Sequence, residues 1–133
     1  MVKKIFLHPQ EIETFYILPT LRRYFALYLK EKEMKQKDIA DILMINSATI
    51  SQYTSSKRGH KISFNEFVLK EIKKSAENIN DQISYIRETQ RILKVIKISG
   101  AICEIHKQIS VVPKGCEQQV TGCHTHIIKV KEA

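Results

Sequence analysis

The residues best suited to metal chemistry are three cysteines and a histidine in the last third of the chain. Cys103 and His106 lie three residues apart, so one helical turn would point both side chains at a common centre. Cys116 and Cys123 follow, and each is preceded by a glycine. Three thiolates and one imidazole complete a tetrahedral zinc shell, whereas three cysteines with a weaker fourth ligand would hold an iron–sulfur cluster. The sequence therefore predicts a metal site at these four residues and leaves zinc and iron–sulfur as open alternatives.

Other interpretations of this cluster also remain open. His124 or His126 could replace His106 as a ligand, and the spacing lacks the paired Cys-x2-Cys units of a zinc ribbon. The cysteines could instead be three core residues that happen to lie near one another. A Cys–His catalytic pair is disfavoured because no third orienting group is evident. We therefore expect no enzymatic activity and no small-molecule substrate.

A second region, residues 36–53, has the pattern of two short helices joined by a tight turn. Apolar residues recur at helical spacing up to Leu43 and again from Ile50 onward. The few residues between them leave room only for a turn, and Asn46 or Ser47 is a natural N-cap for the second helix. This layout is typical of a helix-turn-helix, although an ordinary helical hairpin would show the same periodicity.

The second of these helices is expected to present small or amide-bearing, uncharged side chains outward. Such a face suits base edges in a major groove, where an amide can pair bidentately with adenine. The basic residues just beyond it would contact the sugar-phosphate backbone, unless they form a solvated loop. The residues predicted to contact DNA are Gln36, Ser47, Ala48, Thr49, Ser51, Gln52, Ser55, Lys57, Arg58 and Lys61.

Helices are expected on the N-terminal side of this unit. Pro9 can open a short one, and Pro19 begins a new one that runs to about Lys32 as a scaffold. On the second helix, Arg22 and Arg23 are expected to face water or phosphate. The apolar stripe expected before Pro19 consists of Ile12, Phe15, Tyr16 and Leu18.

Two more helices are expected after it. The capping-box pattern from Ser63 to Glu66 opens the first, and the second should span residues 82–98. Apolar residues recur at spacings of three and four through both helices. They could pack on the domain's own core or on a second subunit. This seam comprises Val68, Ile72, Ala76, Ile79, Ile83, Ile86 and Leu93.

The composition of the 133-residue chain narrows the class of protein. The formal net charge of +8, from 22 basic and 14 acidic side chains, suits a polyanionic partner. Few glycines and prolines favour helices over a many-turned β fold. The only apolar run near the start, residues 5–7, is too short for a signal-peptide core, and no run approaches the ~18 residues of a membrane span. We expect a cytoplasmic protein that contacts no membrane.

Several of these motifs resemble those of a known group. Leu-Pro at 18–19 with Arg-Arg at 22–23, then residues 36–53, then Ser-Lys-Arg-Gly at 56–59 resemble the archaeal predicted transcriptional regulators of the Cro/C1 (Xre-like) helix-turn-helix class. The resemblance covers about residues 9–123. It implies a lambda-repressor-like helical DNA-binding domain that acts on promoters.

The resemblance also implies roles for particular residues. Gln36 would brace the backbone, while Ser47, Ala48 and Gln52 would approach bases. Met44 stands where the group's pattern usually has glycine, so the turn would need a strained or an altered backbone.

The cysteine-bearing tail of the same group is also similar to part of this chain. The matching element is Cys103-x2-His106 with the later Cys116, whereas a further cysteine that is common near Leu93 is missing.

Together these observations predict an all-α protein in three parts. Residues 9–64 would be the DNA-binding domain, 65–99 a helical connector or dimerisation region, and 100–133 a Cys/His-rich tail. We expect a homodimeric, sequence-specific regulator that binds double-stranded DNA and could couple metal or redox state to operator affinity. The alternatives are an antitoxin-like or other protein-interaction module with a structural zinc site, and a non-specific nucleic-acid binder.

Overall fold

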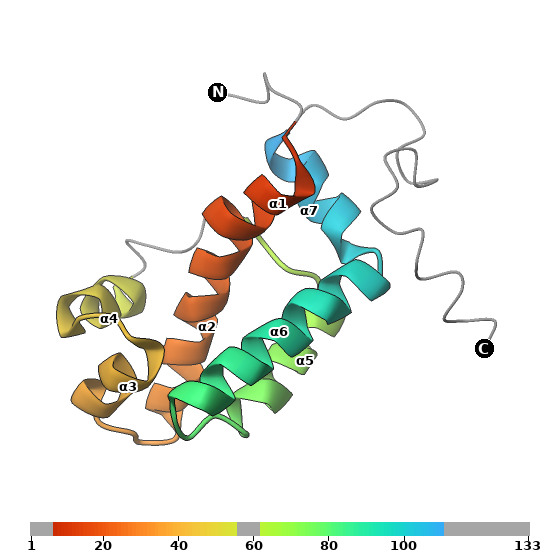
Figure 1. Cartoon of the computed structure of the whole chain (residues 1–133). Coiled ribbons are helices and arrows are strands. Elements are labelled where there is room, and N and C mark those ends of the chain that lie inside the picture. The colour runs from red at the N-terminus through yellow and green to blue at the C-terminus, as the bar shows by residue number, and fades with distance from the viewer. Residues whose placement is uncertain (1–6, 56–61, 111–133) are drawn as a thin grey trace.

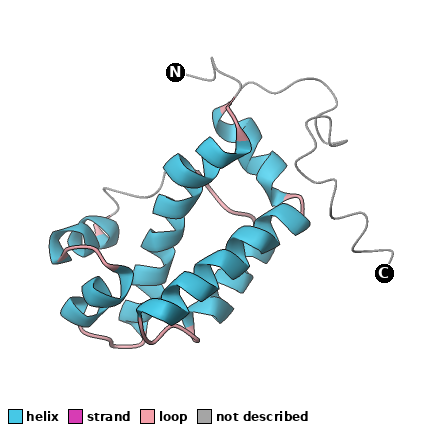
Figure 2. Ribbon diagram, viewed as in Figure 1, coloured by secondary structure: helices cyan, strands magenta, loops and turns pink. Residues whose placement is uncertain are grey.

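Every regular element in the described residues, 7–55 and 62–110 of the computed structural model, is a helix (Figure 1, Figure 2). The expected all-α class is confirmed for this part of the chain. The elements in chain order are α1 (Pro9–Ile12), the π-helix η1 (Glu13–Ile17), α2 (Leu18–Glu31), α3 (Gln36–Leu43), α4 (Ser47–Thr54), α5 (Glu66–Ala76), α6 (Gln82–Ile98) and α7 (Ala101–Ile109).

The first three elements form one continuous rod instead of two helices separated at Pro19. Pro19 has no N–H group, and its ring would clash with the carbonyl of Phe15 in a regular α-helical turn. The chain widens into η1 just before this point, and Leu18 N–H donates to the carbonyl of Glu13, five residues back. The expected inward stripe is partly wrong, because Phe15 is 64% exposed while Ile12 and Ile17 are fully buried.

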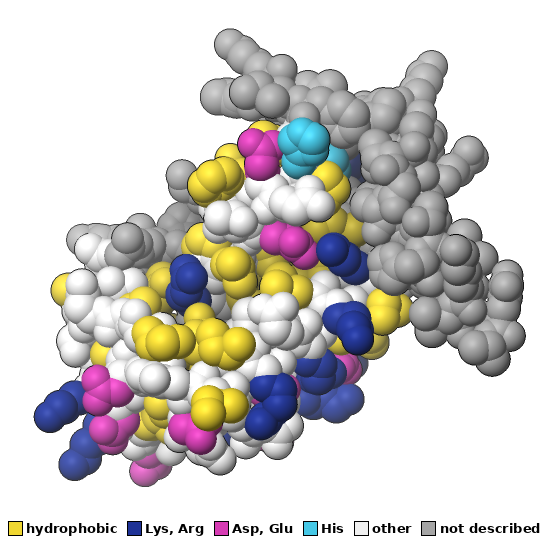
Figure 3. All heavy atoms as spheres, in the orientation of Figure 1, with side chains coloured by type: hydrophobic (Ala, Val, Ile, Leu, Met, Phe, Trp, Pro, Cys, Tyr) yellow, Lys and Arg dark blue, Asp and Glu magenta, His cyan; other side chains and the backbone are white. Residues whose placement is uncertain are grey.

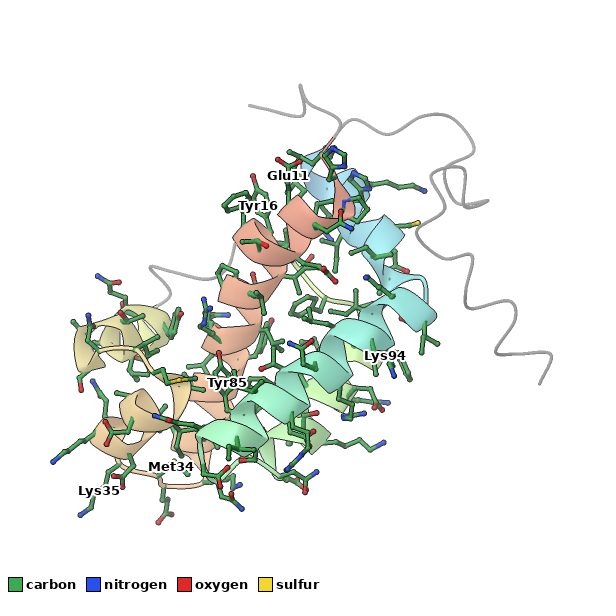
Figure 4. All side chains as sticks on the ribbon, in the orientation of Figure 1. Glu11, Tyr16, Met34, Lys35, Tyr85 and Lys94 are labelled. Carbon is green, nitrogen blue, oxygen red and sulfur yellow. The ribbon has the colours of Figure 1, made fainter. Side chains whose placement is uncertain are left out.

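The core forms where α2 meets α3, α4, α5 and α6 (Figure 1). Leu21, Phe25 and Leu29 lie on one face of α2, as their spacing predicts, and each is almost completely buried. Phe25 meets Tyr85 of α6, which Figure 4 labels, edge to face with ring centroids 6.2 Å apart. Burying a side chain of this size contributes roughly 1.5–3 kcal/mol, so α2 is the element on which the other helices are assembled.

The start of α5 differs from the expected capping box. Asn65 is the N-cap, and its Oδ1 accepts a hydrogen bond from Val68 N–H at 2.8 Å. The helix begins two residues later than the expected cap at Ser63, because Asn65 takes the capping position. The Ser63 backbone N–H and carbonyl are instead bonded to the side-chain amide of Gln108, at 2.9 Å each.

Arg91 clamps α6 to α5. Its Nη1 donates to Glu71 Oε1 at 2.9 Å, and its Nη2 donates to the Glu71 carbonyl at 2.9 Å and to Ser75 Oγ at 2.8 Å. Arg91 Nε also lies 3.3 Å from Oε1 of the buried Glu88. Hydrogen bonds from Arg91 and then Lys74 hold the pKa of Glu71 below its usual range. This clamp aligns α6 on the core.

The apolar seam divides between core and surface. Its first four members, Val68, Ile72, Ala76 and Ile79, are buried in the protein's own core. Leu93 is half-buried, whereas Ile83 and Ile86 are 76% and 48% exposed. Among the helices in the described ranges, none is both long enough and apolar enough to cross a membrane.

Candidate nucleic-acid interface

The turn between α3 and α4 has the conformation that its sequence predicts. Met44 adopts the left-handed region, with φ 58° and ψ 43°. Met44 N–H donates to the Asp41 carbonyl, and Ile45 N–H donates to the Ala40 carbonyl at 3.0 Å, which is the Schellman pattern for ending a helix. A residue with a Cβ pays about 1–2 kcal/mol for this conformation, so the strain expected at Met44 is present.

The start of α4 is fixed by Asn46. Its Oδ1 accepts hydrogen bonds from Thr49 N–H at 2.9 Å and from the Thr49 hydroxyl at 3.0 Å. A cap of this kind contributes about 1 kcal/mol. Thr49 itself is only 9% exposed, so its side chain serves the cap and does not lie on the outward face. We therefore remove Thr49 from the residues expected to contact DNA.

The remaining predicted contacts on α4 do lie on its outer face. Ile50 and Tyr53 are buried and turn the opposite side of the helix toward the core. No residue of α4 carries a charge. Apart from the methyl group of Ala48, the outer face is therefore a row of hydroxyl and amide side chains that can both donate and accept hydrogen bonds. The exposed members are Ser47, Ala48, Ser51, Gln52 and, just after the helix, Ser55.

Gln36, which is half-buried, connects α3 to α4 at the surface of the protein. Its Nε2 donates to the carbonyl of Ser47 at 2.9 Å and to Oγ of Ser51 at 3.0 Å, and its Oε1 accepts from Lys30 Nζ at 3.2 Å. These hydrogen bonds brace the backbone of α4 against the start of α3. Gln36 fixes the angle at which the outer face of α4 is presented.

The basic residues near α4 lie in different environments. Lys57, Arg58 and Lys61, the predicted phosphate contacts, lie outside the described residues. Arg22 does not face outward as expected: it is half-buried, and its Nε donates to the Tyr85 hydroxyl at 3.2 Å. Arg23 lies over the ring of Tyr24, with 5.5 Å from its Cζ to the ring centroid.

The part of the protein that presents α4 has balanced charges. Residues 7–55 carry six basic and six acidic side chains, so the part of the protein that presents α4 has no net charge. Lys35 and Lys37 are exposed at the start of α3, and Lys35 points into solvent in Figure 4. Attraction to a polyanion must then come from a few local cations and from the residues at 57, 58 and 61.

Cys103 and His106 lie on the buried face of α7. They are 8% and 2% exposed, and Cys103 belongs to the main hydrophobic cluster. Burial lowers the pKa of His106, partly offset by a hydrogen bond with the Leu7 backbone, so the imidazole is neutral at pH 7. Cys116, Cys123, His124 and His126 lie outside the described residues. Within residues 7–55 and 62–110, no group of three or more His, Cys, Asp or Glu could hold a metal ion.

The sequence interpretation missed the structural role of α7. Ser110 Oγ accepts a hydrogen bond from Leu7 N–H at 2.9 Å, and Asn65 Nδ2 donates to Glu104 Oε1 at 2.9 Å. The helix thereby joins the two ends of the described chain to the start of α5. The sequence does carry a pattern that predicts this packing, because apolar residues recur at helical spacing along α7. They form its inner face, which consists of Ala101, Ile102, Ile105 and Ile109.

Comparisons with known proteins find no relative. Neither a protein-family model, nor a curated protein, nor a solved structure matches the chain.

Proposed function

We propose that this protein is a transcriptional regulator that binds double-stranded DNA through the outer face of α4, in a lambda-repressor-like arrangement of helices. The observation that carries the proposal is the composition of that face. It is exposed and uncharged and can form hydrogen bonds, while Ile50 and Tyr53 anchor its other side in the core. Groove edges of bases are read by side chains of this kind.

The supporting helix α3 offers contacts for the phosphate backbone. Its N-cap, Lys35, makes no side-chain capping bond, so the first amide N–H groups of α3 can bind an anion. Lys35 and Lys37 are exposed beside them. In the proposed complex, α3 lies across the backbone and α4 enters the groove, so that phosphate contacts set the register and bases set the specificity.

The experiment starts with selection of a binding site from random double-stranded DNA. Gln52→Ala is then expected to cost roughly 1–3 kcal/mol on the selected site and to relax the preference at one base pair. Gln10→Ala is the matched control, because Gln10 is an exposed glutamine on α1. The proposal fails if no sequence is enriched, or if Gln52→Ala weakens binding to random DNA equally.

The phosphate part of the proposal has its own readout. Neutralising Lys57, Arg58 or Lys61 one at a time is expected to weaken binding to every sequence alike and to reduce the slope of log affinity against log salt by about one. An unchanged slope in the triple variant would show that these three side chains contact no phosphate.

The metal site remains a further proposal, with Cys103, Cys116 and Cys123 as thiolate ligands and His106 as the fourth. What supports it is the neutral imidazole of His106 beside a cysteine on the same helix. Metal content and DNA affinity of Cys116→Ser, made with iron and zinc both supplied, test it. Metal lost with unchanged DNA affinity would make the site a structural one, and a parent protein without metal would rule it out.

A further inference from the structure

Three large apolar side chains are exposed together where the α3–α4 turn meets the start of α6. Ile83 is 76% exposed, Met44 52% and Ile86 48%. They line one shallow groove with Gln82 and Arg87. Figure 3 shows hydrophobic side chains gathered in this part of the face that it presents. We call Met44, Ile83 and Ile86 the apolar patch.

The exposure of the apolar patch does not result from loose packing of α6. Ile83 and Ile86 continue the seam whose earlier members fill the core, and the α6 residues around them that face inward, Tyr85 and Thr89, are buried. The helix is thus correctly seated, with apolar side chains on its outer side as well. Contiguous exposed apolar side chains on a folded domain mark a surface that another molecule covers.

The charges around the patch identify that molecule. Arg87 lies at one edge, with a side chain that is 61% exposed. Asp41 of α3 is exposed at the edge beside Gln82, where Gln82 Nε2 and Met44 N–H both donate to the Asp41 carbonyl, at 2.9 and 3.3 Å. A two-fold axis through the centre of the patch carries each edge onto the opposite edge of a second copy. The cation of one copy then meets the acidic edge of the other.

We propose that the apolar patch is the centre of a two-fold symmetric homodimer. Ile83 and Ile86 of the two copies pack across the axis, and Arg87 of each copy pairs with Asp41 of the other. The rim carries both signs of charge, which suits a self-complementary interface and suits neither an anionic membrane nor nucleic acid. An interface of standard size buries about 800 Å² per partner, so the patch forms its apolar centre within a polar rim.

This proposal goes beyond DNA binding and does not depend on it, because association is measured without DNA. The test is sedimentation equilibrium of the full chain. The parent protein is expected to dimerise, and Ile83→Lys and Ile86→Lys are each expected to weaken the dimer by at least about tenfold, since each places two cations in the interface. Ile98→Lys is the matched control, because Ile98 is an exposed isoleucine of α6, 41% exposed, outside the patch.

A charge exchange tests the geometry of the interface. Arg87→Asp and Asp41→Arg are each expected to weaken the dimer, and the double variant is expected to recover most of the loss, since it restores opposite charges across the axis. All these side chains are exposed, and Arg87 Nε in addition lies 3.5 Å from Oε2 of the buried Glu88 in its own chain. A parent protein that stays monomeric at millimolar concentration overturns the proposal. So does an equal effect of Ile98→Lys, or a double variant no better than the single ones.

Discussion

The outer faces of α4 and of the first turns of α6 are both exposed, yet they differ in chemistry. The face of α4 is built from hydroxyl and amide groups, which water already satisfies in the unbound protein. The face of α6 is built from the apolar patch, whose burial is favourable with almost any apolar surface. A polar face gains little from contact unless its partner matches it, whereas an apolar face associates readily and discriminates less. The first therefore suits recognition and the second suits assembly.

The two faces are also held differently. The position of α4 depends on two buried side chains, Ile50 and Tyr53, and on short-range bonds, namely the Asn46 cap and the bridge from Gln36 to Ser47 and Ser51. The position of α6 depends on the Arg91 clamp and on core packing along most of its length. Substitutions can therefore alter one face while leaving the other in place.

The largest expected effect comes from removing assembly while recognition is kept. Ile86→Lys is expected to lower the affinity for a DNA fragment with two half-sites by roughly 100-fold, because the second half-site no longer benefits from effective concentration. Binding to a single half-site should not change, as a gel-shift titration on both fragments would measure. An equal loss on the single half-site would mean that Ile86 acts on α4 and not on assembly.

The second-largest effect is expected from removing the hydrogen bonds by which Arg91 clamps α6 to α5. Arg91→Met is expected to lower the free energy of unfolding by about 2 kcal/mol, reduced from the value for a fully buried pair because the Arg91 side chain is 39% exposed. Urea unfolding measures it. Lys94→Met is the control, since Lys94 is exposed on the same helix. If both variants unfold alike, the clamp contributes nothing to the seating of α6.

Removing the cap of α4 should have a smaller effect. Asn46→Ala leaves the Thr49 N–H without its side-chain acceptor and is expected to lower the free energy of unfolding by about 1 kcal/mol. The same measurement on Asn78→Ala, whose side chain makes only a 3.4 Å contact at the surface, is expected to show almost no change. Identical curves for the parent protein and Asn46→Ala would contradict the capping role.

Met44 lies in the turn that leads into α4 and also belongs to the apolar patch beside α6. Its substitution should therefore affect stability and assembly in opposite directions. Met44→Gly is expected to raise the free energy of unfolding of the monomer by about 0.5 kcal/mol by relieving the left-handed backbone, after the entropic cost of glycine. The dimer should weaken because the patch loses a side chain. Glu33→Gly is the control: its φ of 66° is also positive, and it does not line the patch. It should gain stability without loss of assembly.

The smallest effect at neutral pH is expected at His106. Burial keeps the pKa of His106 below the ordinary value of 6.5. As the pH falls below about 6.5, the histidine is therefore protonated in the unfolded chain before it is protonated in the folded protein, which favours unfolding. The parent protein should therefore lose thermal stability from pH 7 toward pH 5 more steeply than His106→Leu. His8→Gln, at an exposed histidine, should keep the steep slope of the parent. Parallel slopes for the parent and His106→Leu would mean that His106 is protonated in the folded protein.

Sequence reasoning was most successful where neighbouring residues decide the structure. The bounds of α6 and the tight turn with its Asn46 cap were predicted because periodicity and capping are local. The capping box at Ser63 was wrong because Asn65, two residues later, is the N-cap of α5. The break at Pro19 was wrong because the π-helix η1 accommodates the proline within a continuous helix. The direction of Ile83 and the burial of Cys103 could not be read from spacing, since both depend on which distant helices occupy each face.

The hydrogen bond between Leu7 and Ser110 has a mechanical consequence. It joins two residues 103 positions apart, at the end of the molecule where α1 meets α7 (Figure 1). A pulling force applied between these residues would load that bond and α7 first, and it would open the fold from that end one contact at a time. The outer face of α4, which lies away from that end in Figure 1, would carry tension only after α7 had separated.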